Sequence, residues 1–146
     1  MTEKEKNKKG SVLIVEDDKL ISLVQERLLK KLGFEVKGKA KSGSEAIEKV
    51  KSSSPDLILM DISLAGDMDG IETMTEIRKF SDTPVIYLSG DQDKYNYRRA
   101  KSTGFIDYLV KPVTADELVG PVSRAVKESR KQKQGSNPQS YSRAAG

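Results

Sequence analysis

The residues of this chain that could do chemistry are polar side chains placed at the carboxyl ends of short apolar runs. They are Glu16, Asp17, Asp61, Ser89 and Lys111. In an open parallel α/β sheet, ligands bind outside the carboxyl ends of the strands, where the strand order reverses. If the apolar runs are strands of one such sheet, carboxylates, a hydroxyl and an ammonium group meet in one place. That combination favours phosphoryl transfer, which depends on positioning and charge stabilisation.

Asp61 is the predicted phosphoacceptor, because it follows an almost wholly apolar run and a carboxylate there must reach solvent or a partner. A carboxylate can attack phosphorus and form an aspartyl phosphate. Aspartate side chains are ordinarily ionised at neutral pH, so the attack needs no general base. An anion that attacks an anionic donor does need a cation to screen the two charges.

The predicted cation is magnesium, which prefers hard oxygen ligands and keeps several waters. Asp17, Asp61, Glu16 through a water, and a main-chain carbonyl just after Asp61 could hold it. Lys111 would pair with one phosphoryl oxygen, and Ser89 would donate a hydrogen bond to another.

Apolar runs and turn residues predict five strands that alternate with five helices. The predicted strands span residues 11–15, 34–39, 56–60, 84–88 and 105–110. This alternation indicates an α/β fold with a parallel sheet covered by helices on both faces. The apolar positions at helical spacing are Ile21, Val24, Leu28 and Leu32; Ala46, Ile47 and Val50; Ile71, Met74 and Ile77; and Leu118, Val119, Val122 and Val126.

Several signals predict where the helices begin and end. Asp18 is expected to cap the first helix, and the segments 42–45 and 114–117 fit the capping-box pattern. The segment 91–103 is predicted to be helical although it has few apolar residues. Pro121 lies beyond the first turn of the last helix and predicts a kink, at a cost of ~3 kcal/mol if nothing compensates.

Composition limits the class of protein. The 146 residues predict one domain over 11–128, between a disordered charged tail at 1–10 and a flexible basic and polar tail at 129–146. There is no cysteine and no histidine, which excludes thiolate sites and histidine general-base catalysis by this chain. Any phosphohistidine must therefore come from a second protein. No signal peptide and no membrane-spanning run is recognised, so a cytoplasmic location is expected.

The net charge of +4 belongs to the two ends of the chain, because the segment 11–126 carries two more acidic than basic residues. A nucleic-acid interface needs basic residues gathered on a folded face, and this segment offers no obvious one. The sequence therefore predicts no direct nucleic-acid partner and no membrane partner.

At the residues named above, the chain resembles the receiver domain of two-component response regulators, in the single-domain form similar to chemotaxis regulators. The resemblance covers about residues 11–128, and the matching stretches are 12–18, 56–61, 68–72, 84–89 and 104–112. It implies a flavodoxin-like, doubly wound receiver fold with a five-stranded parallel sheet of order 2-1-3-4-5. It also implies phosphorelay signal transduction.

The resemblance assigns a role to each site residue. Asp61 is the position phosphorylated by a sensor histidine kinase or histidine phosphotransfer protein, and Glu16 and Asp17 form the acidic pair that binds magnesium. The main-chain carbonyl of Ser63 is a further metal ligand. The phosphoryl-contacting and switch positions are Ser89, Gly90, Tyr108, Lys111 and Pro112. Tyr108 is the switch aromatic, and Gly90 stands where the family usually has alanine. The Lys111–Pro112 peptide bond is expected to be cis.

Signal output is expected through a face made of the fourth helix, the fifth strand and the fifth helix, where Tyr95, Tyr97, Arg98 and Arg99 are typical interface anchors. That face would bind a downstream protein, or a second copy of the chain after phosphorylation. The loop after Asp61 is one residue longer than the commonest family form, so its geometry is harder to predict. The chain could be a stand-alone receiver or a fragment of a larger regulator or hybrid kinase.

Three other functions fit these residues less well. A phosphatase of the haloacid dehalogenase type generally has a second aspartate two residues after the nucleophile, and Ser63 stands there. A flavin-binding module would need a phosphate cradle that the loops lack, and the acidic cluster would repel its phosphate. A pseudo-receiver that only binds partners would not need Asp61, Lys111 and the acidic pair. The sequence therefore predicts a signalling switch that is not an enzyme beyond slow release of its own phosphate.

Overall fold

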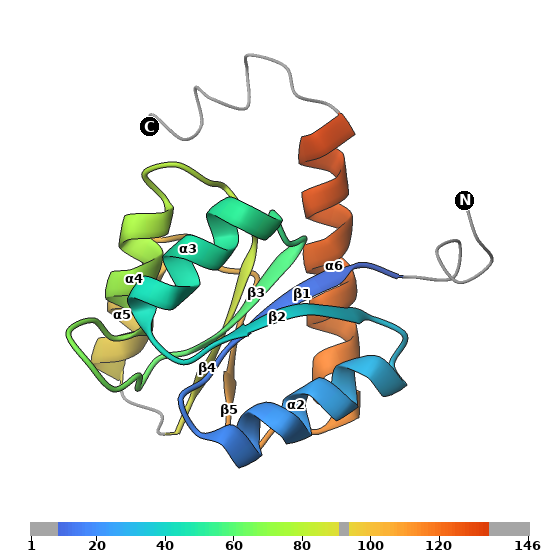
Figure 1. The fold of residues 1–146 in the computed structure, drawn as a ribbon, viewed down its shortest axis with the longest axis horizontal. Coiled ribbons are helices and arrows are strands. Elements are labelled where there is room, and N and C mark those ends of the chain that lie inside the picture. The colour runs from blue at the N-terminus through green and yellow to red at the C-terminus, as the bar shows by residue number, and fades with distance from the viewer. Residues whose placement is uncertain (1–8, 91–93, 135–146) are drawn as a thin grey trace.

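The computed structural model of the protein describes residues 9–90 and 94–134, in which five strands and five helices alternate (Figure 1). The strands are β1 (Ser11–Val15), β2 (Glu35–Ala40), β3 (Leu57–Asp61), β4 (Val85–Ser89) and β5 (Asp107–Val110). They form one parallel sheet of order β2-β1-β3-β4-β5, which confirms the predicted topology. Strands β2, β3 and β4 begin one residue later than predicted, and β5 begins two residues later.

Helices cover both faces of this sheet because the central strands are apolar on both sides. The helices are α2 (Lys19–Lys31), α3 (Gly43–Ser53), α4 (Gly70–Ile77), α5 (Lys94–Lys101) and α6 (Ala115–Gln134). Alternate residues of β1 show the division: Val12 and Ile14 pack with the cluster under α2 and α6, whereas Leu13 and Val15 pack with the cluster under α3 and α4.

The helix caps partly follow the prediction. The Asp18 carboxylate accepts hydrogen bonds from the main-chain N–H groups of Leu20 and Ile21 at 2.9 and 3.0 Å. The predicted box of Thr114 and Glu117 forms in both directions. At α3, Ser42 accepts from the N–H of Glu45, but the carboxylate of Glu45 lies near Lys49 instead of returning to the cap.

Three apolar positions at helical spacing are exposed. Ile21 and Val24 of α2 are 36% and 49% exposed, and Val119 of α6 is 37% exposed. The buried face of α2 consists of Ser22, Gln25 and Leu29. The helix is turned in this way because the sheet covers only one side of it, and its apolar stripe faces the groove beside the loop that follows β5.

The domain ends later than the sequence predicts. Residues 129–134, assigned to a flexible tail, continue α6, which runs through Pro121 to Gln134. Ser129 is buried, and its hydroxyl donates to the Asp56 carboxylate at 3.1 Å. Gly10, assigned to the disordered tail, is also buried. The rest of both tails and residues 91–93 of the predicted fourth helix lie outside the described residues. Within those residues, no helix combines the length and apolarity of a membrane span.

Candidate functional site

The predicted site residues come together at the carboxyl edge of the sheet. Asp61 ends β3, the central strand, and Glu16 and Asp17 follow β1 beside it. One carboxylate oxygen from each of these three residues lies within 4.8 Å of the others. Glu16 and Asp61 are buried, at 3% and 2% exposed. The topology therefore produces the acidic cluster that the strand ends predicted.

Lys111 is the cation of this cluster. Its Nζ lies 3.2 Å from Glu16 Oε1 and 3.2 Å from Asp61 Oδ1, so one ammonium group serves two buried carboxylates. The Lys111–Pro112 peptide bond is cis, as predicted. With Asp17 alongside, the site holds more negative than positive charge when all four groups are ionised, and a divalent cation would relieve that excess.

The neighbouring charges and burial shift the pKa values of Glu16 and Lys111. Burial raises the pKa of Glu16 to about 7, and the nearby Asp61 charge adds to this, although the N–H of Asp18 donates to Glu16 Oε2 and opposes it. Burial alone would lower the pKa of Lys111, but the negative charges of Asp61 and Glu16 outweigh it and the pKa is raised. Lys111 is therefore charged at neutral pH, and the pKa of Glu16 lies close to neutral pH.

The loop after Asp61 closes over the acidic pair. The main-chain N–H of Ser63 donates to Asp61 Oδ1 at 3.1 Å, and the N–H of Ala65 donates to Asp17 Oδ2 at 3.1 Å. Ser63 itself is exposed, and Asp17 is half-buried. The longer loop thus reaches across the site and orients Asp17. Sequence patterns gave no signal for this contact, because a main-chain donor can belong to any residue.

The same loop ends in a tight turn against the strand that carries Asp61. The N–H of Gly70 donates to the carbonyl of Ile62 at 2.8 Å, and a Cβ on Gly70 would collide with the carbonyl oxygen of Asp61. Only glycine allows this approach. Asp69 caps α4 through a reciprocal box with Glu72, which the segment 69–72 could have revealed as an Asp-x-x-Glu pattern.

The remaining predicted residues surround the acids. Ser89 is buried at the end of β4, and Gly90 is exposed with open space around its Cα. Tyr108 on β5 is half-buried, and its ring centroid lies 6.4 Å from that of Tyr87. Its hydroxyl is buried and has no hydrogen-bond partner among the described residues.

The donor set fits magnesium. The cluster offers hard carboxylate oxygens from three residues, and the half-exposed Asp17 leaves room for the waters that this ion retains. Thiolate and imidazole ligands, which favour transition metals, are absent because the chain has no cysteine or histidine.

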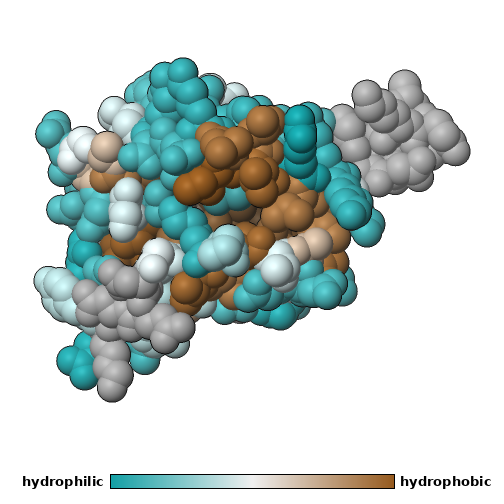
Figure 2. All heavy atoms as spheres, turned by 90° about the horizontal axis from the view of Figure 1, so that it is seen from below, coloured by the Kyte–Doolittle hydropathy of each residue, from teal (hydrophilic) through white to brown (hydrophobic). Residues whose placement is uncertain are grey.

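An exposed apolar groove adjoins the site and was not predicted. Leu20 of α2 is 69% exposed, and a groove of about 360 Å³ runs between α2 and the loop after β5. Figure 2, which views the molecule from below, shows apolar side chains gathered on this face. The lining residues are Leu20, Ile21, Val24, Gln25, Leu28, Lys111, Pro112 and Val113. Since Lys111 belongs to both, the groove and the acidic site are continuous.

Comparison with known proteins gives a consistent result. The family described as "Response regulator receiver domain" matches residues 12–123. The transcriptional regulatory protein PdtaR of Mycobacterium tuberculosis is 34% identical over 119 residues, which are 82% of this chain and 58% of that protein. The chemotaxis protein CheY of Bacillus subtilis is 34% identical over 116 residues, which are 79% of this chain and 96% of that protein. The chain thus spans little more than half of the first relative and almost all of the second.

Solved structures share the fold. The signal receiver domain of a modulated diguanylate cyclase from Desulfovibrio desulfuricans G20 superposes with a TM-score of 0.77 at 34% identity, covering 84% of this chain and 98% of that one. A CheY-like receiver domain protein from Methanospirillum hungatei JF-1 superposes with a TM-score of 0.76 at 27% identity, covering 84% and 98% of the two chains.

Proposed function

We propose that this chain, which belongs to the family of response regulator receiver domains, accepts a phosphoryl group on Asp61 and acts as a switch in two-component signal transduction. The observation that carries the proposal is the arrangement of Asp61, Lys111, Glu16 and Asp17 at the carboxyl edge of the sheet. Among the described residues, Asp61 is a buried carboxylate that must share one cation, Lys111, with a second acid, and such a carboxylate is positioned for chemistry. A fully compensated carboxylate would instead be a structural element.

The donor we propose is a phosphohistidine, and it must belong to a partner protein because this chain has no histidine. A carboxylate oxygen of Asp61 attacks phosphorus and forms the O–P bond, while the N–P bond breaks and its electron pair returns to the imidazole. Lys111 Nζ, 3.2 Å from Asp61 Oδ1, compensates the charge of the phosphoryl oxygens. The hydroxyl of Ser89, at the end of the neighbouring strand, donates a hydrogen bond to the phosphoryl group. Gly90 has no side chain and leaves room for the phosphoryl donor to approach.

Asp17, Asp61, the Ser63 carbonyl and, through water, Glu16 would hold magnesium. When bound, this ion supplies charge neutralisation for an anion that attacks an anion. The residues of the chain prepare that site: Ala65 orients Asp17 through its main-chain N–H, and Ser63 orients Asp61 in the same way.

The partner is a sensor histidine kinase or a histidine phosphotransfer protein, and the cytoplasm is where such a soluble donor would meet this chain. It would cover the apolar groove beside α2, since the groove shares Lys111 with the site. Burying the exposed Leu20 and Val24 would remove apolar surface from water, which favours the complex. A downstream protein, or a second copy of the chain, would bind the face of α5, β5 and α6, where Tyr95 and Tyr97 are exposed.

The direct test is phosphorylation without a partner. The protein is incubated with magnesium and acetyl phosphate, and intact mass is measured. We expect a single phosphoryl adduct in the wild type, none in Asp61→Asn, and much less without magnesium. An equal adduct in Asp61→Asn would show that another residue accepts the phosphoryl group.

The groove is tested separately with Val24→Asp, using Val119→Asp on α6 as a control of similar exposure. With a phosphorylated histidine protein that labels the wild type, we expect Val24→Asp to slow transfer at least tenfold and Val119→Asp to leave it unchanged. Both variants should react normally with acetyl phosphate. Equal slowing of both would argue against the groove as the donor surface.

A further inference from the structure

Helix α5 is attached to the domain by few side chains. Of residues 95–101, only Ala100 is fully buried, and Tyr95, Tyr97, Arg98 and Lys101 are exposed. A short helix with one buried side chain gains little from packing, so its position depends on the individual contacts that remain. Arg99 and Tyr97 each make such a contact.

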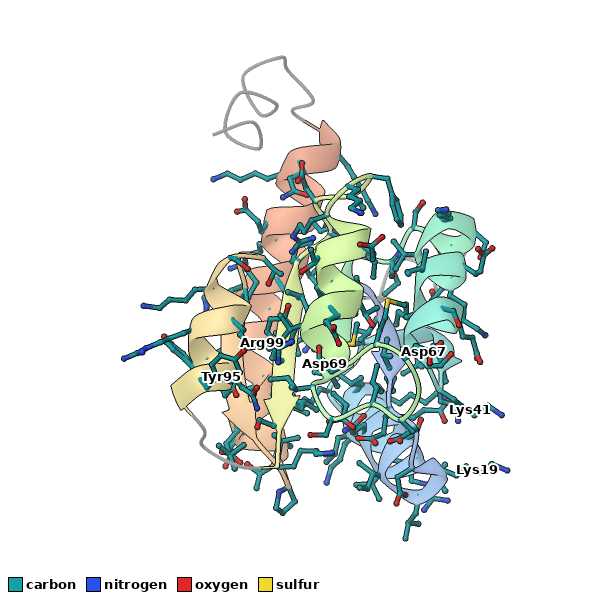
Figure 3. All side chains as sticks on the ribbon, turned by 90° about the vertical axis from the view of Figure 1, so that its left-hand side faces the viewer. Lys19, Lys41, Asp67, Asp69, Tyr95 and Arg99 are labelled. Carbon is teal, nitrogen blue, oxygen red and sulfur yellow. The ribbon has the colours of Figure 1, made fainter. Side chains whose placement is uncertain are left out.

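Arg99 joins α5 to the loop that follows the phosphoacceptor. Its guanidinium lies 2.8 Å from Asp69 Oδ2, and the two side chains are 26% and 27% exposed. Figure 3 shows Arg99 on α5 and Asp69 at the start of α4, next to each other. Arg99 also donates to the Asn96 side chain at 3.2 Å, and its guanidinium lies 5.6 Å from the ring of Tyr95. The arginine is therefore held on its own helix in the orientation that reaches Asp69.

Asp69 is fixed to the site itself. Its other oxygen, Oδ1, accepts from the N–H of Glu72 at 2.8 Å, which makes it the N-cap of α4. The next residue, Gly70, bonds the carbonyl of Ile62 and lies against the main chain of Asp61. The anion that Arg99 contacts thus lies at the end of the loop that follows Asp61, next to a residue that packs against the Asp61 main chain.

Tyr97 connects α5 to the strand on the other side. Its ring meets Phe105 and Tyr108 edge-on, with centroids 5.5 and 5.3 Å apart. Tyr108 is directed toward Tyr87, and its buried hydroxyl lacks a hydrogen-bond partner among the described residues. A buried hydroxyl without a hydrogen-bond partner costs free energy. The contact with Tyr97 therefore stabilises the inward position of the Tyr108 ring, and the unpaired hydroxyl destabilises it.

We propose that the Arg99–Asp69 ion pair is a latch that holds helix α5 closed over an inward Tyr108, so that closure of α5 and phosphorylation of Asp61 stabilise each other. This inference rests on the proposed function and adds the positioning residue that couples it to output. The latch favours closure, and the unpaired hydroxyl of Tyr108 opposes it. The two contributions therefore offset each other in part, which lets a change at the site shift the position of α5.

The latch is tested first without phosphate, by amide hydrogen exchange of the full chain. We expect Arg99→Gln to speed exchange in α5 about three- to fivefold, the range of a partly exposed ion pair. Arg98→Gln removes the same charge from the same helix without breaking the pair and serves as the control. Asp69→Asn can still cap α4, so its effect should equal that of Arg99→Gln and should not add to it. Arg99→Lys should retain most of the protection.

Coupling is tested with beryllofluoride and magnesium, which mimic the phosphoryl group, by titration followed through NMR shifts. If closure of α5 and phosphorylation stabilise each other, the mimic must raise the equilibrium constant for closure by the same factor by which closure raises the affinity for the mimic. We expect Arg99→Gln to weaken beryllofluoride binding by up to the factor seen in exchange. Tyr108→Phe removes the unpaired hydroxyl and should strengthen binding by about fivefold.

The outcomes separate the two proposals. Equal exchange in Arg99→Gln and Arg98→Gln would overturn the latch, and so would unchanged beryllofluoride affinity in Arg99→Gln when α5 exchange has risen. Absence of any phosphoryl adduct in the wild type, measured by intact mass on the same preparation, would instead overturn the proposed function, and the coupling with it.

Discussion

Two buried aspartates lie at opposite ends of β3, Asp56 just before the strand and Asp61 at its last residue. They are 8% and 2% exposed. Asp56 accepts hydrogen bonds from the main-chain N–H of Ser11, the Ser11 hydroxyl and the Ser129 hydroxyl, and it pairs with Lys133 at 2.9 Å. Burial by itself would raise the pKa of Asp56, but Lys133 and Ser11 outweigh it and the pKa is lowered.

Among the described residues, the donors to Asp61 found here are fewer. It accepts from the N–H of Ser63 and shares Lys111 with Glu16, while Asp17 adds a further negative charge close by. The two ends of β3 thus hold the same side chain, but the negative charge is compensated at Asp56 and only partly compensated at Asp61. A buried carboxylate with a full set of donors joins secondary-structure elements, whereas one left in an excess of negative charge is available to a cation and to phosphorus.

The largest expected difference between the two ends is chemical. Asp56→Asn should leave the phosphoryl adduct with acetyl phosphate and magnesium unchanged, whereas Asp61→Asn should abolish it, because only Asp61 faces Lys111 and the acidic pair. Intact mass gives both results. Loss of the adduct in a folded Asp56→Asn protein would mean that the two ends of β3 are not functionally separate.

The second difference is in stability, which we expect to fall on substitution at one end of β3 and not at the other. Asp56→Asn turns an acceptor of several bonds into an amide that can accept fewer, and it should lower the free energy of unfolding by about 2 kcal/mol. Asp61→Asn relieves repulsion from Glu16 and Asp17 and, without magnesium, should not lower it. Urea unfolding in metal-free buffer measures both. A larger loss in Asp61→Asn would contradict the comparison.

A third difference should appear in the pH dependence. Folding raises the pKa of Glu16 from 4.5 to about 7, so its contribution to stability is complete below pH 4.5 and is lost as pH rises to about 7. Folding lowers the pKa of Asp56, so its contribution is lost only in acid, as pH falls through the folded value. Glu16→Gln should remove the loss of stability between these two pH values. Urea unfolding at both ends of that range tests it, and an unchanged slope would contradict the assignment.

The smallest effect is expected at Lys133, whose side chain is 53% exposed. Lys133→Gln removes one partner of Asp56, but the donors from Ser11 and Ser129 remain. We therefore expect a loss of less than about 1 kcal/mol in the free energy of unfolding. Lys131→Gln, in the same part of α6, is the control and should cost nothing measurable. A loss as large as that of Asp56→Asn would mean that the ion pair, rather than the hydroxyl and N–H donors, compensates Asp56.

By itself, the sequence determined the sheet order, through its resemblance to a family, and the position of each acid, through the apolar runs that precede them. Both depend on local pattern: buried parallel strands read as apolar runs, and their carboxyl ends share one edge. Capping by Asp18 and by Thr114 was predictable for the same reason, since an N-cap acts on the next three residues.

Only the tertiary structure decided how these local pieces face one another. Ile21 and Val24 have helical spacing, yet they line a groove because no element within residues 9–90 and 94–134 covers that side of α2. Residues 129–134 look like a polar tail, yet they continue a helix because Asp56, more than 70 positions away, accepts from Ser129 and Lys133. Ala65 over Asp17 and Arg99 beside Asp69 are likewise contacts between distant segments. Such contacts follow from packing the whole chain, which a pattern of neighbouring residues does not contain.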